Sequence, residues 1–497
     1  MKTPMQDRVS LSTGLMIGLL VGLLATAATV HAYPIDAYDE TGIRRLDYYD
    51  RAQRGEVNGR KLAPGAMLSN AAVVPRLTGT EYTFEFESDP AYASQLKSFL
   101  GEDADRYGLA VLDVTDPEQP IYAEYNGGIR ENVGSVGKML VGLAFFQTLA
   151  DIYPDDLAAR ERVLKDTWIV ADDFVNYDHH EVVFWDPDTM DFSFRKVHPG
   201  DSGSLFEWLD WMLSASNNGA ASTVEKQLIL LKHFGRDYPV SVEQEQTFFA
   251  EHGPRALGEI FLDAMNGAVV RNGLNPDLLR QGSFFTRTGK QKVAGTSSYG
   301  NPRELVHLLM LVEQGRMVDA WSSTEMKRLL YMTQKRIRYA SHPALLDYAV
   351  YFKSGSLYSC QPEPEFVCKK YQGNKRNQLA SVAIVEGPED TQDVHYLVAV
   401  SSNVLYKNSA VAHQTLAMRI HRMVEARHAE RLAQRKAERA AARAAVEAEA
   451  ALEAAGAGAD HSAMPGSAEA IIDGPLEPGQ DVGVEQPDLT LPPARNQ

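Results

Sequence analysis

A serine and a lysine three positions apart could carry out nucleophilic chemistry in this chain. Ser135 and Lys138 lie in ENVGSVGKMLVGLAFF (131–146), where a polar segment passes into an apolar run that predicts a helix. Residues three apart share one face of a helix, so the Lys138 amine could take the proton of the Ser135 hydroxyl. The alternative is an ordinary helix that Ser135 caps and from which Lys138 extends into solvent. A second Ser-x-x-Lys, at Ser94 and Lys97, shows that spacing alone does not decide.

Two further short motifs follow along the chain. Ser216-Asn217-Asn218 ends the helical pattern SLFEWLDWMLSAS, and Lys353-Ser354-Gly355 lies in the strand-like run YAVYFKSGSLYS. Each motif is weak alone, because Ser401-Ser402-Asn403 repeats the second and Arg287-Thr288-Gly289 imitates the third. Only the set that begins at 135, 216 and 353 combines this order with suitable flanking elements.

The elements around the motifs predict one sheet built from both ends of a domain. GLAVLDVTD and PIYAEYNGG are typical of two strands joined by a turn, and they precede Ser135 directly. Short links between the later strands favour antiparallel pairing. Helical patterns separate the two groups, and a long helix begins near Ser409. We therefore expect an α/β (α+β) fold, an antiparallel sheet flanked by helices with an all-helical subdomain. The later strands are expected at 348–359, 377–387 and 394–404, and the intervening helices include 204–216 and 302–315.

The three motifs in this setting resemble the signature of the penicillin-recognising serine hydrolases, which include class A β-lactamases and D-alanyl-D-alanine peptidases. The hairpin before Ser135, the helix before Ser216 and GNPRELVHLLMLVEQG (300–315) are also similar, and the resemblance covers about residues 90–425. It implies the serine β-lactamase/transpeptidase-like fold, an acyl-enzyme at Ser135, and no metal or organic cofactor. The implied substrates are a small-molecule β-lactam or a peptidoglycan stem peptide.

The resemblance assigns proton transfer to the first two motifs. Ser135 would be the nucleophile and Lys138 its base, with a pKa lowered by burial and nearby positive charge. Ser216 would relay the proton to the leaving nitrogen, and Asn218 would hold the side-chain amide of the substrate.

Substrate binding is assigned to the third motif. Lys353 would attract the substrate carboxylate and Ser354 would donate a hydrogen bond to it. Gly355 would let the substrate approach the strand closely. The backbone N–H groups of Ser135 and Ser356 would form the oxyanion hole.

The chain departs from the class A pattern at the residue that activates water. Class A β-lactamases carry a glutamate before the helix that 300–315 resembles, whereas 260–303 contains none. Asp277 is the best-placed substitute, and Glu243 or Glu245 could serve from a rearranged loop. Three functions therefore stay open. They are a β-lactamase with turnover, a D,D-peptidase or amidase/esterase with slow β-lactam deacylation, and a catalytically weak cell-envelope binding protein.

A polar segment, 155–203, lies between the first two motifs. Its His179 and His180, with nearby acidic residues, suggest a metal site, but the ligand spacing is not distinctive and we interpret them as surface polar residues. The segment could line or cover the cleft and so change the substrate.

The N-terminus and the cysteines predict export. Lys2 and Arg8 precede an apolar stretch, 14–30, and small residues follow at a possible cleavage site, as in a secretory signal peptide. The alternative is an uncleaved membrane anchor, because the stretch is almost long enough to span a bilayer. We therefore expect a periplasmic or secreted protein. In an oxidising compartment Cys360 and Cys368 would form a disulfide.

Length and charge set the remaining bounds. A chain of 497 residues can form more than one domain, and a net charge of −17 argues against nucleic acid as a partner. An Ala/Glu/Arg-rich helix near the C-terminus is interpreted as a charged spacer or a coiled-coil site for an unknown partner. The expected parts are a signal peptide (1–32), an N-terminal extension (33–88), a serine hydrolase domain (89–427), the Ala/Glu/Arg-rich helix (428–456) and a disordered acidic tail (457–497).

Overall fold

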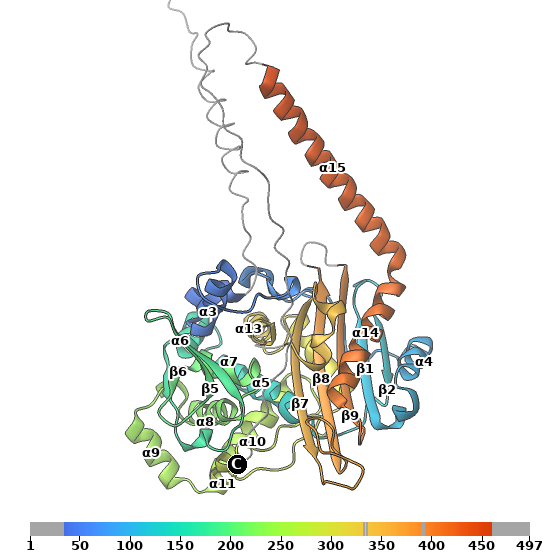
Figure 1. Cartoon of the computed structure of the whole chain (residues 1–497). Helices are drawn as coiled ribbons and strands as arrows, with labels where there is room; N and C mark the ends of the chain where they lie inside the picture. Colours follow the sequence, from blue (N-terminus) through green and yellow to red (C-terminus); the bar gives the residue numbers. More distant parts are fainter. Residues whose placement is uncertain (1–33, 332, 334–335, 389–392, 460–497) are drawn as a thin grey trace, which may run out of the picture. The chain divides into compact units, whose positions relative to one another are not determined.

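A computed structural model describes residues 34–331, 333, 336–388 and 393–459 (Figure 1). The predicted signal peptide or anchor and nearly all of the predicted acidic tail lie outside these residues. The chain divides into two compact units, one up to Leu432 and one from Ala433 onward.

Five antiparallel strands form the main sheet, in the order β2-β1-β9-β8-β7. Strands from opposite ends of the domain meet in its middle, where Tyr107 of β1 pairs with Ser402 of β9. This arrangement confirms the predicted antiparallel sheet flanked by helices. The strands are β1 (Tyr107–Asp113), β2 (Ile121–Tyr125), β7 (Ala349–Ser359), β8 (Arg376–Gly387) and β9 (Val394–Asn403).

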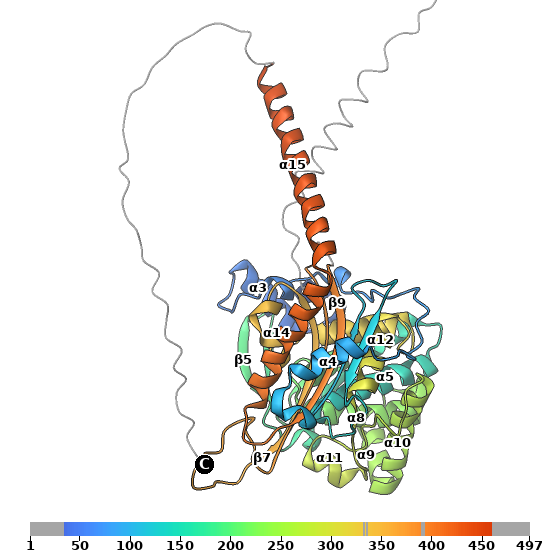
Figure 2. The same ribbon diagram turned by 90° about the vertical axis from the view of Figure 1, so that its right-hand side faces the viewer.

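Both faces of the sheet are buried, because successive side chains of a strand point to opposite faces. Leu109 and Val111 of β1 pack in one core, whereas Ala110 and Leu112 pack in the other. Helices α4 (Pro90–Ser98) and α14 (Ser409–Arg427) supply side chains to the first core and lie across that face in Figure 2.

The larger core lies between the other face of the sheet and the remaining helices, in which α5 (Lys138–Ile152) is central. Buried side chains surround α5, which is why its sequence is apolar on all sides. The segment Gly134–Ile152 is the one helix of the described residues that is long and apolar enough to cross a membrane, and 72% of it is buried, as in a core helix. The other helices of this region are α6 (Leu157–Asp166), α7 (Leu205–Leu213), α8 (Asn218–Phe234), α9 (Val242–Glu251), α10 (Pro254–Arg271), α11 (Arg287–Lys292), α12 (Pro302–Glu313) and α13 (Ala320–Tyr331).

The polar segment 155–203 forms short β structure beside these helices. A hairpin of β4 (Glu181–Asp186) and β5 (Asp191–Lys196) is one two-stranded sheet, and β3 (Trp168–Val170) pairs with β6 (Ser202–Ser204) in another. The expected all-helical subdomain is therefore interrupted by four strands.

The N-terminal extension contains helices that pack on the main domain. It contains α2 (Tyr38–Thr41) and an eleven-residue helix, α3 (Arg44–Arg54), whose Leu46 lies in the larger core. The Arg45 guanidinium donates to both carboxylate oxygens of Asp210 in α7, at 2.6 and 2.5 Å, and both side chains are buried. This bidentate ion pair fixes the extension to the helical core.

Breaking that ion pair should strongly destabilise the fold. Arg45→Met leaves the Asp210 carboxylate buried without its counter-charge, so we expect a loss of about 3–5 kcal/mol in the free energy of unfolding, measured with urea. Arg54→Met is the control, because Arg54 is 38% exposed in its ion pair with Asp50 and should lose less than about 1 kcal/mol. Equal losses in the two variants would contradict the expectation.

A helix follows α14, as the Ala/Glu/Arg-rich sequence predicts. It is α15 (Ala429–Ala459), and its side chains between 433 and 448 are mostly exposed. A coiled-coil partner for it stays a prediction.

Candidate active site

The three motifs meet at one cleft of the described structure. Ser135 lies in a 3-10 turn, Gly134–Gly137, that leads into α5, and the second motif forms the turn into α8. The third lies on β7, the edge strand of the sheet. Lys138 Nζ is 3.2 Å from Ser135 Oγ, and Lys353 Nζ is 2.8 Å from Ser216 Oγ.

The hydrogen bonds of Lys138 leave the lone pair of its amine for the Ser135 hydroxyl. Its amine donates to the Ser216 carbonyl oxygen at 2.6 Å and to Asn218 Oδ1 at 2.8 Å, and Ser216 Oγ lies at 3.5 Å. A neutral amine has two N–H donors and one lone pair. Because two fixed acceptors take the N–H groups, the lone pair is left for the Ser135 hydroxyl.

Burial keeps both cleft lysines easily deprotonated. Lys138 is 0% exposed, and burial lowers its pKa to about 7, although the negative charges of Asp178 and Glu225 act to raise it. Burial also places the pKa of Lys353 well below its ordinary value, with further lowering from the charges of Lys138 and Arg338. Nearby positive charge was expected to lower the pKa of Lys138. In the structure it lowers the pKa of Lys353 instead.

Hydrogen bonds to Asn217 and Asp178 hold the Ser-Asn-Asn turn in place. Ser216 has a positive φ of 60°, a conformation that a residue other than glycine adopts only where its surroundings fix it. Asn217 is fully buried, and its Oδ1 accepts the N–H of Ala220, capping α8. Asp178 Oδ2 accepts the N–H groups of Asn218 and Gly219, at 2.7 and 3.1 Å.

The third motif brings β7 against the backbone of the nucleophile turn. A Cβ at Gly355 would overlap the Val133 carbonyl oxygen and the Ser135 nitrogen, and a Cβ at Gly134 would lie 3.1 Å from the Ser356 nitrogen. The two backbone nitrogens predicted for the oxyanion hole therefore lie at one close contact, which requires glycine at 355.

An arginine that the sequence analysis missed supplies a positive charge to the cleft. Arg338 is 9% exposed and donates to Ser354 Oγ at 2.8 Å and to Ser356 Oγ at 3.1 Å. Its guanidinium lies over the Tyr371 ring, 4.6 Å from the centroid. It begins a short 3-10 helix, Arg338–Ser341, outside every motif, so no periodicity or spacing marked it.

The cleft consists of two adjoining hollows of about 400 and 350 Å³. Both are lined by Ser216, Arg338 and His180, and the second reaches Ser135 and Asn218. The segment 155–203 supplies His179, His180, Glu181 and Phe194 to the walls, so it does line the cleft.

The acidic residues considered as water-activating bases lie elsewhere. Asp277 is exposed, Glu243 is exposed on α9, and Glu245 pairs with Lys226. None of them lines either hollow. The side chain of Gln281 lies there instead, since a Cβ at Gly137 would collide with its Oε1. An amide cannot act as a base, so this position does not replace the glutamate.

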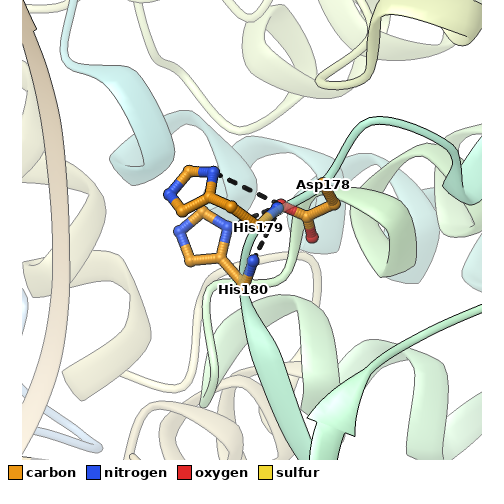
Figure 3. Close-up of side chains that lie close together, drawn as sticks. All are labelled: Asp178, His179 and His180. Carbon is orange, nitrogen blue, oxygen red and sulfur yellow. Dashed lines mark hydrogen bonds and ion pairs between the residues drawn. The ribbon is translucent and has the colours of Figure 1, made fainter. Parts of the chain in front are cut away.

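Asp178, His179 and His180 bring potential metal-binding atoms within 4.8 Å of one another (Figure 3). Both Asp178 oxygens already accept N–H groups, which leaves no reason to assign them to an ion. His179 is a surface side chain, 77% exposed, as predicted, whereas His180 is only 26% exposed and lies in the cleft wall.

No family model and no curated protein matches the chain. Several solved structures are similar to it. A β-lactamase from Sphaerobacter thermophilus is 14% identical, with a TM-score of 0.43 over 66% of this chain and 95% of that one. A class A β-lactamase from Bacteroides cellulosilyticus is 17% identical, with a TM-score of 0.41 over 66% and 93%. A variant of PBP-A, in an acyl-enzyme complex with penicillin G, is 12% identical, with a TM-score of 0.43 over 68% and 98%.

Proposed function

We propose that this protein is an exported serine hydrolase that forms an acyl-enzyme at Ser135 with β-lactams or D-alanyl-D-alanine-type amides. The observation that carries the proposal is the buried Lys138 amine, which lies in hydrogen-bonding reach of Ser135 and Ser216 and has a pKa near neutrality. The Cys360–Cys368 disulfide, which was predicted, fits an oxidising compartment.

Acylation would begin with transfer of the Ser135 proton to Lys138 as Oγ attacks the amide carbonyl. The N–H groups of Ser135 and Ser356 would stabilise the oxyanion. The proton would then pass from Lys138 through Ser216 to the leaving nitrogen, which breaks the C–N bond and leaves the acyl group on Ser135 Oγ. Asn218, whose Oδ1 is used by Lys138, would have its Nδ2 for the side-chain amide of the substrate.

The cations of the cleft suit an anionic substrate group. Arg338, Lys353 and Ser354 lie together on one side, so a substrate carboxylate could bind all three. Such a carboxylate would also favour the charged form of Lys353, whose pKa burial now lowers.

A second candidate is a D,D-peptidase or amidase/esterase that releases β-lactams slowly. Gln281 favours it, because an amide lies against the nucleophile turn where a carboxylate could have activated water.

Labelling with a fluorescent penicillin, beside turnover of a chromogenic β-lactam, tests the proposal. We expect an adduct with the unmodified protein and none with Ser135→Ala, because the Oγ that would carry the acyl group is gone. Ser94→Ala is the matched control, since Ser94 belongs to the other Ser-x-x-Lys and is exposed. Steady turnover would favour the β-lactamase and a lasting adduct the peptidase. Absence of both would contradict the proposal.

A further inference from the structure

His180 has one ring nitrogen fixed by a carboxylate. Its Nδ1 lies 2.7 Å from Asp178 Oδ1, which also accepts the backbone N–H groups of His179 and His180 (Figure 3). Although burial acts to raise the pKa of Asp178, its hydrogen bond to His180 and the charges of His180 and Lys138 hold that pKa below the ordinary value. An ionised carboxylate can only accept, so Nδ1 carries the hydrogen and Nε2 carries a lone pair.

His180 forms part of the wall of the cleft. His180 lines both hollows, and the second of them also contains Ser135, Ser216 and Asn218. Asp178 links the imidazole to the Ser-Asn-Asn turn, because its other oxygen accepts the N–H of Asn218. Within the described part of the chain, no hydrogen-bond partner of Nε2 is found.

The imidazole is neutral under ordinary conditions. Burial, together with the charges of Lys138 and His179, lowers its pKa to about 4, although Asp178 acts to raise it. At neutral pH its Nε2 is therefore able to accept a proton from water.

The other groups near the nucleophile do not suit this task. Gln281 is an amide, and both oxygens of Asp178 are occupied. Glu225 is fully buried, it does not line the cleft, and burial raises its pKa well above the ordinary value, so it holds its proton. The Lys138 amine is directed at Ser135 Oγ, the atom that carries the acyl group at this stage, and its N–H groups are held by the Ser216 carbonyl oxygen and Asn218 Oδ1.

We propose that His180, oriented by Asp178, is the base that activates water for hydrolysis of the acyl group on Ser135. The inference rests on the proposed acyl-enzyme. Water gives one proton to Nε2 while its oxygen bonds to the acyl carbonyl carbon. The tetrahedral intermediate collapses, the bond from carbon to Ser135 Oγ breaks, and the product acid leaves. The imidazolium returns the proton to Oγ as that bond breaks, which restores the resting enzyme.

The test separates formation of the adduct from its loss. His180→Asn keeps an N–H donor for Asp178, because Asn Nδ2 matches His Nδ1 in position, but removes Nε2. We expect labelling by the fluorescent penicillin within about threefold of the unmodified protein. Loss of the label should slow by roughly 100-fold or more, the usual contribution of general base catalysis. His198→Asn is the control, since His198 is exposed in the same inserted segment and does not line the cleft.

The outcomes distinguish this inference from the proposed function. Equal loss of label in His180→Asn and the unmodified protein overturns the role of His180 alone, as does a stable label in the unmodified protein. Slow loss in His179→Asn instead of His180→Asn also overturns it. Absence of any label in the unmodified protein contradicts the acyl-enzyme, and this inference with it. His180→Ala adds a second variant, in which added imidazole should restore part of the deacylation rate.

Discussion

Replacing Lys138 with methionine should slow acylation of Ser135 by about 10²–10⁴-fold, the range that a positioned general base contributes. Methionine fills nearly the same volume but has no amine, so Ser135 Oγ and Ser216 Oγ both lose the group that lies 3.2 and 3.5 Å from them. The measurement is the second-order rate constant for labelling by a fluorescent penicillin, with thermal unfolding as a check that the variant is folded.

Lys97→Met is the matched control for that variant. Lys97 belongs to the other Ser-x-x-Lys, on α4, and it is exposed over the Tyr125 ring. Its replacement should leave labelling unchanged. A Lys138→Met protein that is labelled at the normal rate would exclude the amine as the base.

The pKa of Lys138 predicts how the acylation rate depends on pH. Lys138 accepts the proton of Ser135 only when it is itself deprotonated, and its pKa is about 7 because of burial. The labelling rate should therefore rise about tenfold per pH unit below pH 7 and level off above it. A rate that is still rising near pH 10 would show that Lys138 has the pKa of an ordinary lysine.

The sequence was sufficient to predict those site residues that lie in or next to regular helices and strands. Ser135 precedes a long apolar run that predicts a helix, and Lys353 lies in a run that is typical of a strand. The helix and the strand that carry these residues could therefore be predicted together with the motifs. The order of hairpin, helices and three-stranded meander predicted one sheet built from both ends of the domain, and in the structure β1 pairs with β9. Strong periodicity at both ends of the domain thus predicted the sheet that brings the motifs together.

What the sequence did not reveal lies in loops or depends on charge burial. Arg338 has a positive φ of 54° in a turn whose residues follow no period, so nothing in its neighbourhood marked it. His180 was interpreted as a surface polar residue, because the hydrogen bonds that join Asp178 to the turn before α8 are tertiary and leave no pattern in the local sequence. Nothing in the sequence around Arg45 marks it as buried, since its counter-charge Asp210 lies far along the chain.

Gly355→Ala should damage the active site while adding only one methyl group. The ideal Cβ would overlap two backbone atoms, the Val133 carbonyl oxygen and the Ser135 nitrogen, and neither can swing aside as a flexible side chain could. Either β7 or the turn that carries Ser135 must move. Both nitrogens proposed for the oxyanion hole lie at this contact, and loss of one such donor typically costs about 10²–10³ in rate. We expect labelling by the fluorescent penicillin to slow by at least that factor.

A second glycine variant distinguishes the overlap at Gly355 from general misfolding. Gly128 has no atom within 4 Å of an added Cβ, so Gly128→Ala should leave both labelling and thermal unfolding unchanged. In Gly355→Ala the unfolding temperature should fall only slightly, because β7 keeps its pairing with β8 along eleven residues. A variant that is labelled at the normal rate would mean that the strand moves without displacing the Ser356 nitrogen, and the oxyanion hole would then have to be formed by other donors.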